Sequence, residues 1–271
     1  MTRPAIAIIQ ARMSSSRLPG KVLKPLAGQP MIFHIVQRSR ACRQVEQVVV
    51  ATSTEPSDNP LAAYCAAAGI ACHRGSLDNV LDRYLEVLEA NPHPYCVRVT
   101  GDCPLIDAAF IDKQIEALQA HDGDLTWLAE PAPVLGGQGV HSSRSLRQIA
   151  ACSTHPDDLE HVGSRYLAEH PEQFRIIGLH PPVAVSKANW RVTVDEAPDY
   201  EMMQQLYGAL WRGEPIALGA ALDWMARHPD LAGHNQDVKH SAINQELAAK
   251  RQEWARHVDL FCDWDEPGRI T

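Results

Sequence analysis

Three apolar runs in the first hundred positions have the length of buried β-strands. They cover residues 5–9 (AIAII), 48–51 (VVVA) and 95–99 (YCVRV), and a weaker strand is expected to end at residues 73–75 (HRG). Continuous apolar runs are typical of strands in a parallel sheet, because helices cover both of its faces. The pattern therefore predicts a parallel sheet.

Helical patterns lie between these strands. Pro30 stands at a first-turn position before one helix, and Ser76 is predicted to cap the other. The apolar faces of the two helices contain Met31, Ile32, Ile35 and Val36, and Leu77, Val80, Leu81, Tyr84, Leu85 and Leu88. Alternating strands and helices predict a doubly wound, mostly parallel α/β sheet of Rossmann-like topology, whose ligands bind beyond the carboxyl ends of the strands.

The pattern changes after Glu130, where prolines and glycines make an irregular stretch. The elements predicted beyond it are helices over residues 143–151 and 157–169, strands at residues 174–178 and 190–194, and helices that begin near Pro198 and Val238. The main sheet is thus expected to resume after an interruption.

This pattern divides the chain into three parts. Residues 1–130 and 173–235 are predicted to form the α/β domain, residues 131–172 an inserted segment, and residues 236–271 a C-terminal helical tail. The insertion carries apolar residues that it cannot bury on itself, which predicts that it pairs two identical chains in a homodimer. These residues are Val134, Leu135, Val140, Leu146, Ile149, Val162, Tyr166 and Leu167.

Composition excludes several classes of protein. The 271 residues are 45% hydrophobic, which is enough for a packed core, and the net charge of −8 disfavours nucleic-acid binding. No apolar run approaches the roughly 18 to 20 residues that span a bilayer, so no membrane segment is expected. Seven cysteines without a C-x-x-C pair argue against a disulfide framework or a zinc knuckle and favour the cytoplasm.

The most informative segment is the loop that follows the first strand, residues 10–21 (QARMSSSRLPGK). It supplies cationic, hydroxyl and backbone N–H donors at the position where such a sheet binds its ligand, as a polyphosphate requires. Its spacing is neither that of a Walker A loop nor that of the dinucleotide motif G-x-G-x-x-G. The alternative interpretation is a solvated basic loop.

Residues 8–31 (IIQARMSSSRLPGKVLKPLAGQPM) closely resemble the opening motif of the cytidylyltransferases that activate acidic sugars. This family includes the acylneuraminate and 3-deoxy-manno-octulosonate enzymes, and the spore-coat polysaccharide branch is the most similar. Further blocks agree in the family's order: LDRY at 81–84, RVTGDCPLID at 98–107, EHV at 160–162 and RVTVD at 191–195. Because several independent blocks match, the resemblance is specific.

The resemblance implies a Rossmann-like, GT-A-like nucleotidyltransferase fold. It also implies transfer of CMP from CTP to an acidic sugar, with release of pyrophosphate, in surface-polysaccharide or glycan biosynthesis. The residues it assigns to the nucleotide are Ala11, Arg12, Ser15, Ser16, Arg17, Lys21, Arg74 and Asp82. Arg12, Lys21 and Asp102 are the residues that it makes catalytic.

The resemblance also implies a Mg²⁺ cofactor held by Asp102 and Asp195. Both residues follow predicted strands, so their carboxylates should emerge at one rim of the sheet, whereas Asp107 and Asp199 are expected to cap helices. The residues available to bind the acidic acceptor are His161, Arg165, Lys187 and Arg191.

The sequence departs from the family's pattern at residues 139–143. The spore-coat branch has glycine-leucine-aspartate-valine-glutamate there, whereas this chain has GVHSS and lacks both acidic side chains. His141 cannot replace a carboxylate charge for charge, so the change bears on the acceptor more than on the nucleotide chemistry.

Two other functions fit the same predicted sheet: a glycosyltransferase that consumes a sugar nucleotide, and a non-catalytic nucleotide-binding relative. The D-x-D of metal-dependent glycosyltransferases has a counterpart only at residues 122–124, which precede a strand and are better explained as a helix end and a turn. Cys103, beside Asp102, is interpreted as a small buried residue and not as a nucleophile.

Overall fold

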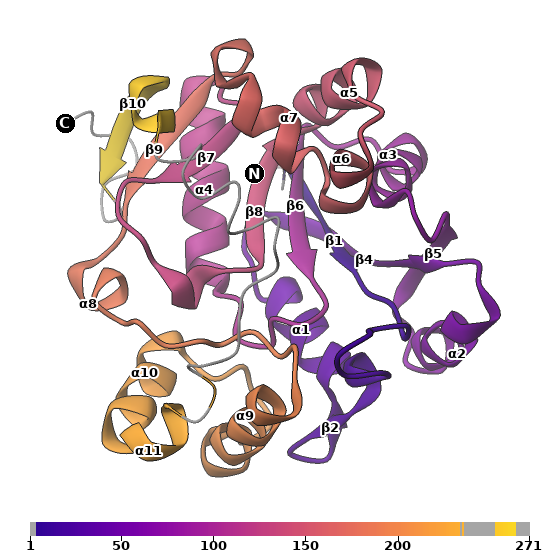
Figure 1. The fold of residues 1–271 in the computed structure, drawn as a ribbon, viewed down its shortest axis with the longest axis vertical. Helices are drawn as coiled ribbons and strands as arrows, with labels where there is room; N and C mark the ends of the chain where they lie inside the picture. The colour runs from indigo at the N-terminus through magenta and orange to yellow at the C-terminus, as the bar shows by residue number, and fades with distance from the viewer. Residues whose placement is uncertain (1–3, 234, 236–252, 264–271) are drawn as a thin grey trace.

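Figure 1 shows the computed structural model, which describes residues 4–233, 235 and 253–263. The strands are β1 Ala5–Gln10, β2 Pro25–Leu26, β3 Gln29–Pro30, β4 Val45–Ser53, β5 Ala71–Gly75, β6 Tyr95–Thr100, β7 Leu125–Leu128, β8 Gln138–Ser142, β9 Ile176–His180 and β10 Val258–Asp263. The helices are α1 Met31–Arg40, α2 Asn59–Ala67, α3 Val80–Ala90, α4 Ala108–His121, α5 Ser143–Cys152, α6 Pro156–His161, α7 Ser164–Glu169, α8 Val183–Ser186, α9 Ala197–Leu210, α10 Leu218–Arg227 and α11 Pro229–Ala232.

The central sheet has eight strands in the order β10-β9-β7-β8-β6-β1-β4-β5. Its strand pairs are parallel except those of β8, which runs antiparallel to β6 and β7. This confirms the predicted doubly wound, mostly parallel fold. The carboxyl ends of β1 and β6 lie side by side, because Gln10 is in register with Thr100.

The two faces of the sheet build two separate cores, and alternating residues of β1 contribute to each. Ala7 and Ile9 pack on the side of α1, α2 and α4, whereas Ile6 and Ile8 pack on the side of α3 and α5. Figure 1 shows α4 and α3 set against the sheet in this arrangement. The apolar run of β1 is continuous because both of its faces are covered.

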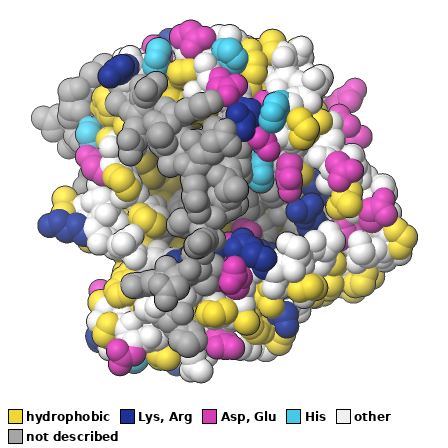
Figure 2. Space-filling model, viewed as in Figure 1, with side chains coloured by type: hydrophobic (Ala, Val, Ile, Leu, Met, Phe, Trp, Pro, Cys, Tyr) yellow, Lys and Arg dark blue, Asp and Glu magenta, His cyan; other side chains and the backbone are white. Residues whose placement is uncertain are grey.

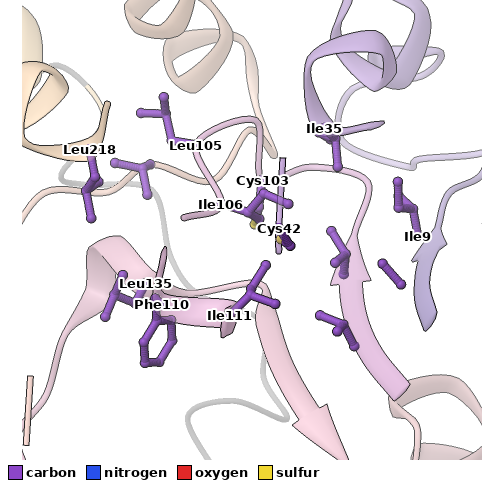
Figure 3. Packing of buried hydrophobic residues seen from close by; sticks show 14 of the residues in the cluster. Ile9, Ile35, Cys42, Cys103, Leu105, Ile106, Phe110, Ile111, Leu135 and Leu218 are labelled. Atoms are coloured by element: carbon purple, nitrogen blue, oxygen red, sulfur yellow. The ribbon is translucent and has the colours of Figure 1, made fainter. Parts of the chain in front are cut away.

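The loop that follows β6 is anchored by its apolar side chains. Cys103, Leu105 and Ile106 are buried, and Figure 3 shows Cys103 and Ile106 in the core near Ile111 of α4. The buried guanidinium of Arg38 donates a hydrogen bond from Nε to the Ile106 carbonyl (2.5 Å). The loop that carries Asp102 is therefore held from within the core.

The prediction for the inserted segment was wrong in two respects. Residues 138–142 form β8, which lies inside the main sheet between β7 and β6. The apolar residues expected to form a dimer surface are buried in the same chain, with Tyr166 partly buried against the core: Val134, Leu135, Val140, Leu146, Ile149, Val162 and Leu167. The strand was missed because QGVHS contains only one strongly apolar residue.

Other predicted elements need correction. Residues 190–194 are not a strand, although Val194 is buried and its N–H donates to the Asp102 carbonyl (2.8 Å). The helix predicted over residues 157–169 is broken into α6 and α7. The break occurs at Val162 (φ 54°) and Gly163 (φ 77°), whose left-handed backbone cannot continue a helix.

Helix α3 begins later than predicted. Its N-cap is Asn79, whose side chain accepts a hydrogen bond from the Asp82 N–H, while the Ser76 hydroxyl accepts one from the Asn79 N–H. The Ser76 side chain therefore shapes the turn before the helix and does not cap the helix itself.

The C-terminal segment also differs from the prediction. The polar helix expected from Val238 lies outside the described residues, but residues 258–263 form β10, an edge strand parallel to β9. Figure 1 shows β10 at the edge of the sheet. Within the described part of the chain, no helix is long and apolar enough to cross a membrane.

Candidate active site

Lys21 occupies the centre of a compact charged site at the carboxyl edge of the sheet. It begins a short 3₁₀ helix, Lys21–Leu23, after Gly20, whose φ of 70° gives the loop its sharp turn. The Lys21 ammonium donates to Asp102 Oδ2 (3.1 Å), Asp195 Oδ1 (3.0 Å) and the Val194 carbonyl (2.8 Å). Its side chain is 10% exposed. The structure thus joins three predicted site residues from distant parts of the sequence.

The ammonium and the carboxylates stabilise each other's charged forms. Burial acts to lower the pKa of Lys21, but Asp102 and Asp195 outweigh it and raise the pKa above its ordinary value. Burial acts to raise the pKa of Asp102, but the Lys21 charge and hydrogen bonds to Thr100, Lys21 and Cys103 outweigh it, so the pKa is lowered. Both groups are therefore ionised at neutral pH.

Asp195 is also bound by two arginines. Arg17 lies 3.1 Å from Oδ1, and Arg191 donates to Oδ2 (2.6 Å). Arg191 further donates from Nε to buried Asp199 (2.8 Å), which accepts the N–H groups of Asp195 and Glu196 as well. Asp199 therefore positions Asp195.

The two helix caps expected from aspartates have different outcomes. Asp107 is the N-cap of α4 and accepts the Phe110 N–H (2.8 Å), as predicted. The N-cap of α9 is Glu196, and Asp199 lies at the third helical position, from which it closes a capping box. The prediction for Asp199 was wrong by three positions.

Asp102 and Asp195 fit a divalent cation. Their oxygens converge on one positive group, the Lys21 ammonium, so this point is already built to hold a cation. Mg²⁺ commonly takes one or two carboxylates and completes its shell with substrate phosphates and water. No group of three or more candidate ligands is present among the described residues, so the protein itself would supply two.

The basic loop after β1, residues 10–21, is held in place by hydrogen bonds of its backbone N–H groups. Gly20 N–H donates to the Met13 carbonyl (2.9 Å), and the Ser15 hydroxyl accepts the Leu18 N–H (3.3 Å). Asp58 is fully buried and accepts the Met13 N–H (2.7 Å). Asp58 is not predicted from the sequence, because no local pattern indicates that it reaches this loop.

The remaining loop residues occupy different environments. Arg12 pairs with Glu160 (3.1 Å), and both side chains are exposed. Ser16 is exposed, while Ala11 is buried and donates its N–H to the Ala51 carbonyl (3.1 Å). Arg12 therefore joins the loop to α6, next to the site.

Arg74 and Asp82 lie farther along the sheet. Arg74 donates to the carbonyls of Ser53 (2.9 Å) and Glu55 (3.1 Å) and to Asn59 Oδ1 (2.8 Å), so it braces the turn after β4. Asp82 is exposed in the first turn of α3. Neither residue contacts the Lys21 cluster through a hydrogen bond or ion pair that the structure describes.

The predicted acceptor residues are not brought together. Arg165 pairs with Asp157 (2.9 Å) and Glu169 (3.3 Å), and Arg191 is engaged with Asp195 and Asp199. Lys187 is exposed at the end of α8. His161 is the last residue of α6 and directly follows Glu160, the residue that pairs with Arg12.

Two sites rejected in the sequence are also rejected by the structure. Cys103 is fully buried, and burial raises its thiol pKa well above the ordinary value, so it is not a nucleophile. Asp122 ends α4 with φ 50°, and Arg144 pairs with both Asp122 (2.8 Å) and Asp124 (2.7 Å). These aspartates precede β7, at the opposite end from the carboxyl edge.

A doubly wound sheet with a basic loop after its first strand and two carboxylates at the same edge defines an α/β nucleotide-binding enzyme. The cytidylyltransferase family profile matches residues 6–205. The spore coat polysaccharide biosynthesis protein SpsF of Bacillus subtilis (strain 168) is 31% identical over 229 residues, which cover 83% of this chain and 95% of that protein. The chain belongs to the cytidylyltransferase family.

Solved structures share the fold. A cytidylyltransferase from Leptospira borgpetersenii serovar Hardjo-bovis (strain JB197) superposes with a TM-score of 0.78 at 24% identity, covering 88% of this chain and 99% of that one. A CMP:2-keto-3-deoxy-manno-octonic acid synthetase complexed with CTP gives 0.56 at 20% identity, covering 74% and 97%. These likenesses confirm the nucleotidyltransferase fold.

Proposed function

We propose that this cytidylyltransferase transfers CMP from CTP to an acidic sugar in polysaccharide biosynthesis. The observation that carries the proposal is the Lys21 ammonium held between Asp102 and Asp195 beside the basic loop. An acceptor hydroxyl attacks the α-phosphorus of CTP, the bond between the α-phosphorus and the oxygen that bridges to the β-phosphate breaks, pyrophosphate departs, and the hydroxyl proton passes to water. The relatives named for spore coat polysaccharide and for 2-keto-3-deoxy-manno-octonic acid support the acceptor class.

The residues of this chain stabilise the charge that grows on the leaving pyrophosphate. Lys21, Arg17 and Arg12 are the cations of the loop, and fixed positive charges lower the barrier of such a reaction. Asp102 and Asp195 would hold Mg²⁺, which supplies further positive charge to the phosphates when bound. Arg191 and Asp199 keep Asp195 in place.

Pyrophosphate release tests this proposal. We expect release from CTP, and little from UTP, ATP or GTP, when Mg²⁺ and 3-deoxy-manno-octulosonate or an acylneuraminate are present. Cleavage of a sugar nucleotide in place of CTP would instead establish a glycosyltransferase. Nucleotide binding without turnover of any acidic sugar would establish a non-catalytic relative.

Metal binding gives an independent test. Asp102→Asn and Asp195→Asn should each weaken Mn²⁺ binding measured by electron paramagnetic resonance, because an amide offers a neutral oxygen in place of a charge. Asp122→Asn is the matched control, since Asp122 pairs with Arg144 at the other end of the sheet. Unchanged Mn²⁺ affinity in both site variants would contradict the assignment.

A homodimer in the cytoplasm completes the proposal. The resemblance to the family supports the homodimer, and the seven free cysteines support the cytoplasm. The apolar residues first expected at the interface do not support the dimer, since they are buried within one chain. Sedimentation at micromolar concentration should give twice the mass of the chain. A fully active monomer would remove the dimer from the proposal.

A further inference from the structure

Arg98 of β6 is a half-buried cation without an acidic partner among the described residues. Its Nε donates to Gln10 Oε1 (3.1 Å), and this neutral amide is the one hydrogen-bond acceptor that the described structure gives its guanidinium. A guanidinium withdrawn from water is costly unless an anion compensates it. Its two terminal nitrogens have the geometry that binds a carboxylate with two parallel hydrogen bonds.

The described residues leave space beside this guanidinium. Arg98 is in register with Gly139 of β8, and cross-strand partners in an antiparallel pair lie on the same face. Among the described residues, a Cβ atom at Gly139 would have only His141 Nε2 within 4 Å, at 4.0 Å. Because Gly139 has no positive φ, the backbone does not require glycine there; its missing side chain instead leaves room next to Arg98.

Two histidines border the same space. His141 lies two residues from Gly139, on the same face of the strand, and its buried Nδ1 has no hydrogen-bond partner in the part of the chain that the structure describes. Burial, with a smaller contribution from Arg98, lowers the pKa of His141 to about 4, so the imidazole is neutral at neutral pH. A neutral imidazole keeps one N–H group, so His141 can donate a hydrogen bond to a carboxylate.

His161 approaches from α6. His161 is the last residue of α6 and follows Glu160, whose carboxylate pairs with Arg12. Burial lowers the pKa of His161; Glu160 and Asp157 act to raise it, and the positive charges of Arg98 and Arg12 act to lower it. Two acidic side chains of this region, Glu160 and Asp157, are already paired with Arg12 (3.1 Å) and Arg165 (2.9 Å). Figure 2 shows histidine, basic and acidic side chains gathered in this region, close to α6 and β6.

We propose that Arg98, His141 and His161 bind the carboxylate of the acceptor sugar, with Gly139 leaving the room for it. This inference rests on the proposed function and names the residues that select an acidic acceptor. Gln10 supports the site from β1, because it accepts the hydrogen bond of the Arg98 Nε and is the residue at which β1 ends and the basic loop begins. The acceptor's acidic end would thus lie against the sheet, beside the nucleotide's phosphates.

Arg98→Gln tests the proposal directly. It should raise the KM for 3-deoxy-manno-octulosonate or an acylneuraminate roughly 10- to 100-fold, the value of a charge-assisted pair, while the KM for CTP changes less than about twofold. The preference of the wild-type protein for each acid over its methyl ester should disappear. A merely structural role for Arg98 would not remove that preference.

His141→Asp provides a second variant, which adds a negative charge to the site where Arg98→Gln removes a positive one. It introduces a carboxylate diagonal to Arg98, which should pair with the guanidinium and repel the acceptor's own carboxylate. His141→Asn, without the charge, should retain most acid binding. Arg147→Gln, at an exposed position of α5, is the matched arginine control and should leave both KM values unchanged.

The outcomes separate this inference from the proposed function. Turnover of the acids with an unchanged acid-to-ester preference in Arg98→Gln and His141→Asp would overturn the inference alone. A raised KM for CTP with an unchanged KM for the acid would assign Arg98 to the nucleotide phosphates. In a third outcome, calorimetry shows that the wild-type protein binds the acid and that Arg98→Gln does not, but the wild-type protein does not turn the acid over. That outcome would overturn the proposed function alone.

Discussion

At the residue scale, Lys21 has one observed role and one proposed role. Its ammonium neutralises Asp102 and Asp195 and donates to the Val194 carbonyl, so it holds the site together. In the proposed reaction a metal ion would take the carboxylates, and the ammonium would face the phosphates as a point charge. We therefore propose that the residue also supplies charge to the reaction.

Replacing Lys21 should affect both roles. We expect Lys21→Ala to lower kcat about 100-fold or more, because it removes a charge that faces the leaving pyrophosphate. The melting temperature without Mg²⁺ should also fall, since two carboxylates lose their counter-charge. Lys24→Ala is the control, as Lys24 lies over the Tyr200 ring 5.3 Å from its centroid. A normal rate in Lys21→Ala would remove the loop from the mechanism.

His141 should make stability depend on pH. Its folded pKa of about 4 lies below the ordinary 6.5, so the folded state resists protonation. The stability contributed by the neutral ring is complete above pH 6.5 and is lost as the pH falls toward 4. Between pH 7.5 and 4.5, urea unfolding of His141→Asn should lose about 2 to 3 kcal/mol less than the wild-type protein. Equal losses in both proteins would contradict this assignment.

At the element scale, the approach of β8 to the loop after β6 shapes the site. Gly137 precedes β8 with φ 75°, and its carbonyl accepts the Thr100 N–H (2.9 Å). A Cβ at Gly137 would lie 2.6 Å from Thr100 Oγ1 and would also collide with Cys103. The strand can therefore pack beside the Asp102 loop only because this residue is glycine.

Gly137→Ala should be destabilising. We expect a loss of more than about 1 kcal/mol in urea unfolding, from the strained backbone and the clash, together with reduced activity because Asp102 is displaced. Gly208→Ala in α9 is the matched control, since a Cβ there meets nothing within 4 Å and alanine favours the helix. Similar stabilities of the two variants would show that the close approach is dispensable.

At the scale of the whole molecule, the chain closes one edge of the sheet with its C-terminal segment. β10 pairs with β9 in parallel, and Phe261 packs against Gly178 and faces Trp127 (6.2 Å between ring centroids). Cys262 is completely buried. Residues more than seventy positions beyond β9 thus cover an edge that would otherwise expose unpaired backbone.

Truncation tests this contribution. A chain that ends at residue 252 should melt at a lower temperature and scatter more light on heating, because the β9 edge and Trp127 become exposed. A chain that ends at residue 263 keeps β10 and should behave like the full-length protein. Identical melting and scattering of the two truncated chains would show that β10 does not protect the edge.

From the sequence alone follow the parallel core, the position of the basic loop after the first strand and the two carboxylates at the same edge. An apolar run such as residues 5–9 indicates from local sequence that a strand is buried on both faces. The end of such a strand indicates a position at the rim of the sheet. Asp102 was predicted correctly at this rim, and Asp195 was also placed there, even though the strand expected before it is absent. The family blocks supplied the reaction class.

The tertiary structure decided which of these groups meet and what surrounds them. Lys21 and Val194 are 173 positions apart, and no local pattern encodes their hydrogen bond. The sequence pattern does not predict β8, because Val140 is its one strongly apolar residue; the strands on either side of it, β7 and β6, hold it in the sheet. The proposed role of Arg98 depends on β8, which brings Gly139 and His141 beside it, because burial and the lack of an acidic partner among the described residues are properties of packing and not of sequence.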